Sequence, residues 1–77
     1  MIIKILGSGC KKCVTLTENT HAALRDLGLT AEVVKVTDFA AIAAHGVMST
    51  PALVIDDKVV SVGKVLSSAE VAALLKG

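Results

Sequence analysis

The chain has 77 residues, of which 53% are hydrophobic, 19% charged and 1% aromatic, and its formal net charge is +1. The high apolar content excludes an intrinsically disordered chain, and nearly balanced charge with a single aromatic residue argues against nucleic-acid binding. The longest stretch without Asp, Glu, Lys or Arg is residues 39–55, which is shorter than the ~20 residues of a membrane-spanning helix. We therefore expect one domain over residues 1–77 that is cytoplasmic, monomeric and bound to neither membrane nor nucleic acid.

The first predicted strand covers residues 2–6, an apolar run with β-branched residues that we expect to be buried on both faces. After Gly7-Ser8-Gly9 the apolar period changes to three and four residues, which predicts a helix from about residue 10 to residue 27. One stripe of this helix should face the core, and it comprises Cys13, Leu16, Thr20, Leu24 and Leu27.

Residues 31–36 predict a second strand, and residues 38–45 predict a short alanine-rich helix that begins at an Asp N-cap. Residues 52–55 predict a third strand. The tight turn Asp56-Asp57 then leads into a fourth strand over residues 58–62, so the last two strands should form a hairpin, although the favoured Asp-Gly sequence is absent.

Ser67 and Glu70 form a capping box that begins a last helix, whose apolar face should contain Val71, Leu74 and Leu75. The element order is therefore β-α-β-α-β-β-α. A right-handed crossover makes the first two strands parallel neighbours, and the hairpin adds two antiparallel strands on the other side of the first strand. The predicted fold class is α/β, with a four-stranded mixed sheet in the order 2-1-3-4 and three helices on its faces.

The two cysteines of the chain, Cys10 and Cys13, stand in a Cys-x-x-Cys spacing. A bridge between them would close a very short loop and remove little unfolded-state entropy, so a structural staple is the weakest interpretation. Cys10 falls at the predicted start of the first helix, where free N–H groups, the helix dipole and the charges of Lys11 and Lys12 favour a thiolate. Cys13 lies one turn further along and should be more buried. This asymmetry suits thiol–disulfide exchange, in which Cys10 attacks and Cys13 resolves the mixed disulfide.

A Cys-x-x-Cys between the first strand and the first helix, with Ser49-Thr50-Pro51 leading into the third strand, resembles the thioredoxin/glutaredoxin superfamily. The resemblance covers essentially the whole chain and is closest to the small thioredoxin-like redox-active disulfide proteins. It implies that Cys10 is the attacking cysteine and Cys13 the resolving one. It also implies a cis peptide bond before Pro51 and a substrate segment docked against Thr50, Pro51 and the Gly7-Ser8-Gly9 loop, Gly9 included.

The sequence also departs from that superfamily. Lys11-Lys12 replaces the usual Gly-Pro or Pro-Tyr between the cysteines, and Gly63-Lys64-Val65 lacks the Gly-Gly-x-Asp-Asp type of stretch with which glutaredoxins hold glutathione. The resemblance thus implies disulfide-containing protein substrates and a thioredoxin-reductase-like flavoenzyme as electron donor, with no bound cofactor. No Trp precedes Cys10, so partner docking should rest on backbone and small side chains. Val47 and Met48 have two interpretations, an apolar docking surface or core packing.

A second function is compatible with the same two sulfurs. The segment 7–13 also resembles the Gly-Met-x-Cys-x-x-Cys loop of small copper chaperone domains, in which paired thiolates bind Cu(I). Ser8 replaces the Met of that loop, and those domains follow the order β-α-β-β-α-β. The alternative is therefore a carrier of Cu(I) or another thiophilic metal. A zinc site is less favoured, because His21 and His45 are far apart in the sequence.

Overall fold

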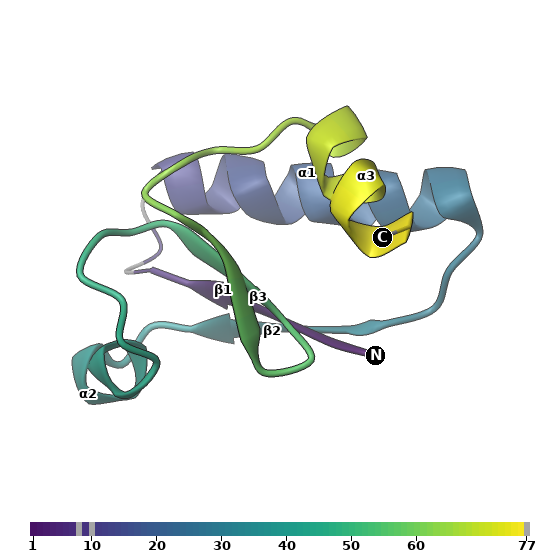
Figure 1. The fold of residues 1–77 in the computed structure, drawn as a ribbon. Helices are drawn as coiled ribbons and strands as arrows, with labels where there is room; N and C mark the ends of the chain where they lie inside the picture. The colour runs from purple at the N-terminus through teal and green to yellow at the C-terminus, as the bar shows by residue number, and fades with distance from the viewer. Residues whose placement is uncertain (8, 10, 77) are drawn as a thin grey trace.

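The computed structural model describes residues 1–7, 9 and 11–76. Within them the strands form one mixed sheet in the order β2-β1-β3-β4, with β1 parallel to β2 and β3 antiparallel to both β1 and β4. The predicted α/β fold class, with this strand order and three helices, is confirmed (Figure 1). The elements are β1 (Ile2–Leu6), α1 (Lys11–Leu27), β2 (Glu32–Val36), α2 (Phe39–Ala44), β3 (Ala52–Ile55), β4 (Lys58–Val62) and α3 (Ser68–Lys76).

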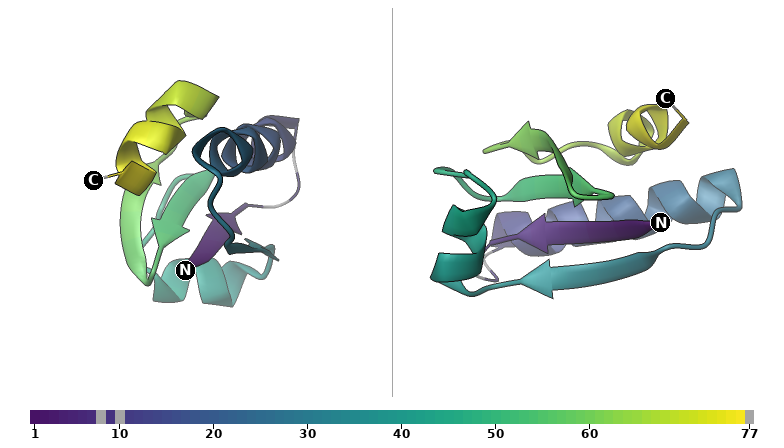
Figure 2. Two further views of the ribbon diagram at one scale, coloured as in Figure 1. Left: turned by 90° about the vertical axis from the view of Figure 1, so that its right-hand side faces the viewer. Right: turned by 60° about the horizontal axis from the view of Figure 1, so that its bottom comes forward.

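The sheet separates two apolar clusters. Helices α1 and α3 lie side by side on one face, and α2 lies on the other (Figure 2). Because successive side chains of a strand point to opposite faces, Ile3 and Ile5 of β1 contribute to a different cluster from Leu6. The cluster with α1 and α3 contains Ile3, Ile5, Leu16, Ala23, Leu24, Leu53, Leu66 and Val71, and the cluster with α2 contains Leu6, Ile42, Val47, Ala52 and Val54.

The first strand is buried on both faces only toward its C-terminal end. Leu6 is fully buried, whereas Ile2 is 45% exposed. The reason is the length of α2, which has 6 residues and packs through Ile42 against Leu6 at that end. The expectation of burial along the whole strand is therefore wrong for Ile2.

The hairpin between β3 and β4 forms as predicted. Asp56 and Asp57 have φ of 48° and 66°, the left-handed conformation that Asp tolerates better than most residues. The turn is also fixed to β1, because the Ile2 N–H donates to Asp56 Oδ1 at 3.0 Å and the Asp56 N–H donates to the Ile2 carbonyl at 2.9 Å.

Helix α3 begins at the predicted capping box. The Glu70 N–H donates to Ser67 Oγ at 3.2 Å, and the Ser67 N–H donates to Glu70 Oε1 at 3.1 Å. The helix packs against the core through the fully buried Val71, with Leu75 half-buried beside it. Leu74 was expected on this face, but it is 40% exposed because its position turns it to the flank of the helix.

Replacing Ser67 with Ala should therefore destabilise the protein by about 1 kcal/mol, since one orphan N–H of the first turn loses its acceptor. For a domain of this size that loss lowers the Tm by roughly 4–8 °C. Thermal unfolding followed by circular dichroism measures it. Ser68→Ala is the matched control, because Ser68 lies inside the helix, and an equal loss in both variants would contradict the capping role.

No helix in the described part of the chain has the length and apolarity needed to cross a membrane.

Candidate functional site

Cys13 is the predicted site residue around which the structure shows the most contacts. It lies in the first turn of α1 on the buried side of the helix, with 4% of its surface exposed. Its carbonyl accepts a hydrogen bond of 2.9 Å from the hydroxyl of Thr17, which is itself buried. The expected burial of Cys13 is thus observed. Cys10 and Ser8 lie outside the described residues, so the role of Cys10 stays a prediction from its position in the sequence.

Gly7 makes room for the Cys13 sulfur. It follows β1 directly, is buried, and its N–H donates to the Val36 carbonyl at 2.9 Å. A Cβ added to Gly7 would collide with Cys13 Sγ. The backbone at Gly7 does not have a positive φ, so the requirement for glycine here is the space that the sulfur occupies.

Thr50 and Pro51 reach the same place from a distant part of the chain. The Thr50–Pro51 peptide bond is cis. Pro51 is fully buried, while Thr50 is exposed. A Cβ added to Gly7 would lie 3.8 Å from Thr50 Cβ. The end of β1, the first turn of α1 and the segment before β3 therefore meet around one sulfur.

Gly63 is a site neighbour that the sequence identified only as the residue after the fourth strand and as part of the stretch Gly63-Lys64-Val65. Its N–H donates to the Pro51 carbonyl at 2.9 Å, its φ is 69°, and a Cβ added to it would lie 3.2 Å from Ser49 Cβ. Both the left-handed conformation and the close approach favour glycine. Gly63 thus fixes the backbone of the segment 49–51 beside the sulfur, and the glycine after β4 was its only signal in the sequence.

A small cavity of about 20 Å³ lies beside Cys13, and its lining includes Gly9, Lys35 and Thr37. That volume holds about one water molecule. Gly9 has a φ of 83°, and nothing lies within 4 Å of an added Cβ, so it requires glycine for its backbone alone. Lys35 and Thr37 could not be identified from the sequence, because the parallel pairing of β2 with β1 brings the end of β2 toward the cysteine.

The predicted electrostatic residues, Lys11 and Lys12, are exposed in the first turn of α1, two and one positions before Cys13. They are available to solvent and to a partner. Their effect on the cysteines remains a prediction.

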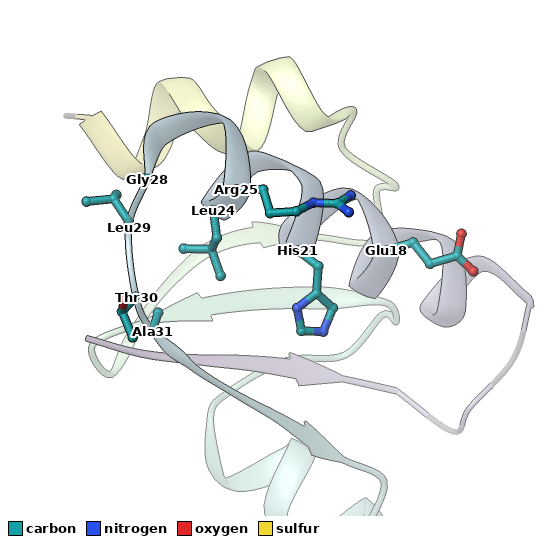
Figure 3. A pocket seen from close by; sticks show the side chains of 8 residues that line it. All are labelled: Glu18, His21, Leu24, Arg25, Gly28, Leu29, Thr30 and Ala31. Carbon is teal, nitrogen blue, oxygen red and sulfur yellow. The ribbon is translucent and has the colours of Figure 1, made fainter.

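Another hollow of the described surface lies away from Cys13. A broad depression of about 760 Å³ follows the second half of α1 and the segment 28–31. Figure 3 shows Glu18, His21 and Arg25 projecting from the helix beside it. None of the site residues predicted from the sequence lines this depression, so it is separate from the cysteine site.

The two-sulfur site of the metal-carrier alternative includes Cys10, which lies outside the described residues. Among residues 1–7, 9 and 11–76, no group of three or more His, Cys, Asp or Glu side chains is arranged to hold a metal ion. The helix α2 between β2 and β3, and α3 after β4, also depart from the β-α-β-β-α-β order of copper chaperone domains.

Comparison with known proteins agrees with this geometry. A family model described as a thioredoxin domain matches residues 1–76. The chain is 43% identical over 76 residues to a protein named thioredoxin from Methanocaldococcus jannaschii, a match that covers 99% of this chain and 87% of the relative. It is 33% identical over 75 residues to a protein named thioredoxin from Methanothermobacter thermautotrophicus, with 97% of each chain covered. The similarity therefore extends along nearly the whole chain, far beyond the cysteine segment.

Proposed function

Because the chain belongs to the thioredoxin family, we propose that Cys10 and Cys13 are its redox-active pair and that they reduce disulfides in partner proteins. Membership makes the chain a thioredoxin-like redox protein, a thiol–disulfide oxidoreductase in the general sense. The observation that carries the finer proposal is the burial of Cys13, whose sulfur lies against Gly7 beside Thr50 and the cis bond to Pro51.

The exchange runs in two steps. In the first, the Cys10 thiolate attacks one sulfur of the partner disulfide, the partner S–S bond breaks, and the other partner sulfur leaves as a thiolate that takes up a proton. In the second, the Cys13 thiolate attacks the Cys10 sulfur of the mixed disulfide and releases the second partner thiol. The protein ends with a Cys10–Cys13 disulfide, and two electrons have passed to the partner.

The surroundings of the pair give each residue a separate task. The exposed Lys11 and Lys12 add positive charge that favours the Cys10 thiolate. The exposed Thr50, which the buried Pro51 holds in place, offers its backbone to an extended partner segment, and Gly9 lines the cavity beside Cys13 that the segment would approach. The proposed electron donor is a thioredoxin-reductase-like flavoenzyme of the cytoplasm, because Gly63-Lys64-Val65 lacks a glutathione-binding stretch.

The test is a redox titration of the purified protein in mixtures of a dithiol and its oxidised form. The pair should titrate as one two-electron transition, in which about 30 mV changes the equilibrium constant tenfold. The reduced protein should then reduce a disulfide of insulin. Its own two thiols become a disulfide, and insulin gains two thiols. The readouts are alkylation followed by intact mass and a thiol count.

A Cys10→Ser/Cys13→Ser double variant is the control, and it should neither titrate nor reduce insulin. The proposal would be contradicted if Cys10 and Cys13 of the wild-type protein were oxidised independently and formed no disulfide with each other. Tight Cu(I) binding in a competitive titration without any transfer to insulin would also contradict it, because that result would favour the metal carrier.

A further inference from the structure

Two large apolar side chains stand out from the surface. Phe39 is 84% exposed and Met48 is 97% exposed, whereas the next most exposed large hydrophobic side chain of the described residues, Met1, is at 49%. Single exposed hydrophobic residues are ordinary in soluble proteins. These two are different because they line the same groove.

The groove is apolar and has the size of a side-chain site. Ile42 and Val47, both buried in the cluster under α2, form part of its lining, and Thr37 and Thr50 also line it. None of its described lining residues is charged. Its volume is about 260 Å³. Its uncharged lining suits an uncharged side chain of a partner protein better than a charged one.

The groove is continuous with the cysteine site. Thr50 lines it, and Thr50 Cβ lies 3.8 Å from the Cβ position of Gly7, which in turn is against Cys13 Sγ. Thr37 lines both the groove and the small cavity beside Cys13. A partner segment whose sulfur reaches the cysteines therefore has its adjacent side chains within reach of the groove.

The fold does not require Phe39 or Met48. Phe39 is the first residue of α2, which is capped by Asp38 through a hydrogen bond of 3.2 Å from the Ala41 N–H and is anchored in the core by Ile42. Met48 follows the buried Val47, and the segment 49–51 is held by Gly63. Their exposure therefore leaves apolar surface beside Thr50 that a bound partner would remove from water.

We propose that Phe39 and Met48 form a specificity pocket that accepts an aliphatic or aromatic side chain next to the cysteine of the partner disulfide. This inference rests on the function proposed above and names the class of substrate. A charged neighbour is rejected, because it would lose its hydration without gaining a partner in the groove.

The experiment measures the reaction of the reduced protein with short peptides of the type Xaa-Cys-Xaa, whose sulfur is in a disulfide with 5-thio-2-nitrobenzoate. Attack on the peptide sulfur breaks that disulfide and releases the coloured thiolate, which is the better leaving group. The neighbours Xaa are Leu, Ser or Asp. The wild-type rate constant should be about tenfold higher for the Leu peptide than for the Ser peptide, and lowest for the Asp peptide.

The variants Phe39→Ala and Met48→Ala should each reduce the Leu preference to about threefold, and the double variant should remove it. Leu29→Ala is the matched control, because Leu29 is 41% exposed but lies on the segment after α1, away from the groove. It should keep the full preference and should react at the wild-type rate with the symmetric disulfide of 5-thio-2-nitrobenzoate. For the Phe39 and Met48 variants, the preference is taken as the ratio of the Leu-peptide to the Ser-peptide rate constant, so that any general change in reactivity cancels.

Two results would overturn the pocket. One is a wild-type protein that reacts with the symmetric disulfide but shows no preference among the peptides, and the other is a double variant that keeps the preference. No reaction with the symmetric disulfide would overturn the proposed function and the pocket with it. A concentration-dependent dimer in sedimentation that Phe39→Ala abolishes would assign the groove to a second copy of the chain and overturn the pocket as well.

Discussion

A Cys13→Ser variant is expected to stop at the mixed disulfide and to lose roughly a thousandfold or more in turnover. The attack by Cys10 needs nothing from Cys13, so the first step proceeds. The second step fails because a Ser hydroxyl cannot displace the bound partner as a thiolate does. Reaction with a peptide disulfide, an acid quench and intact mass spectrometry should show the protein–peptide adduct as a stable species.

The burial of Cys13 provides the control. In Cys10→Ser the remaining cysteine, Cys13, is only 4% exposed and its sulfur lies against Gly7, so a partner sulfur in solution should not reach it and no adduct should form. Adduct in this variant but not in Cys13→Ser would exchange the roles of the two cysteines. Adduct in both variants would show that Cys13 is accessible and would remove the asymmetry on which the mechanism depends.

Local sequence signals predicted the fold well wherever one residue type satisfies one backbone requirement. The capping box at Ser67 and Glu70 marked the start of α3, and Asp38 marked the start of α2. Asp56 and Asp57 turned the chain between β3 and β4, even without the favoured glycine, because Asp tolerates a positive φ. These signals act within a few residues, so the sequence contains all the information they need.

Burial was harder to predict because it depends on what lies opposite. Ile2 belongs to an apolar run but is 45% exposed, since α2 is too short to cover that end of the sheet. Leu74 has the spacing of a core residue but lies on the flank of α3. Periodicity gives the apolar face of an element, and the lengths and positions of its neighbours decide how much of that face is covered.

The candidate site could likewise be predicted only in part from the sequence. The positions of Cys13, Thr50 and Pro51 followed from motif and element order, but the contacts that assemble them did not. Gly63 contacts the segment 49–51 only through the pairing of β3 with β4. Likewise, the sequence did not place Phe39 in a groove with Thr50, because only the tertiary structure brings these two residues together.

Gly7→Ala is expected to destabilise the protein by about 1–3 kcal/mol, the usual cost of an extra methyl group in a closely packed interior. Alanine can adopt the backbone conformation at this position, and the hydrogen bond from the Gly7 N–H to Val36 is retained. The added Cβ nevertheless collides with Cys13 Sγ, so either the sulfur or the end of β1 must move. Such a loss is a large share of the ~5–15 kcal/mol that holds a typical domain folded, and urea unfolding at unchanged m value measures it.

A double-mutant cycle with Cys13→Ala identifies the collision as the cause. Removing the sulfur alone should destabilise the protein by leaving a small void, but in the Gly7→Ala background it also makes room for the new Cβ. The double variant should therefore be more stable than the sum of the single changes predicts, by about 0.5–3 kcal/mol. Additive losses would place the strain of Gly7→Ala elsewhere. A positive coupling would mean that Gly7 is required because the resolving sulfur occupies the space of its missing side chain, which ties the first glycine of the loop to the chemistry of the site.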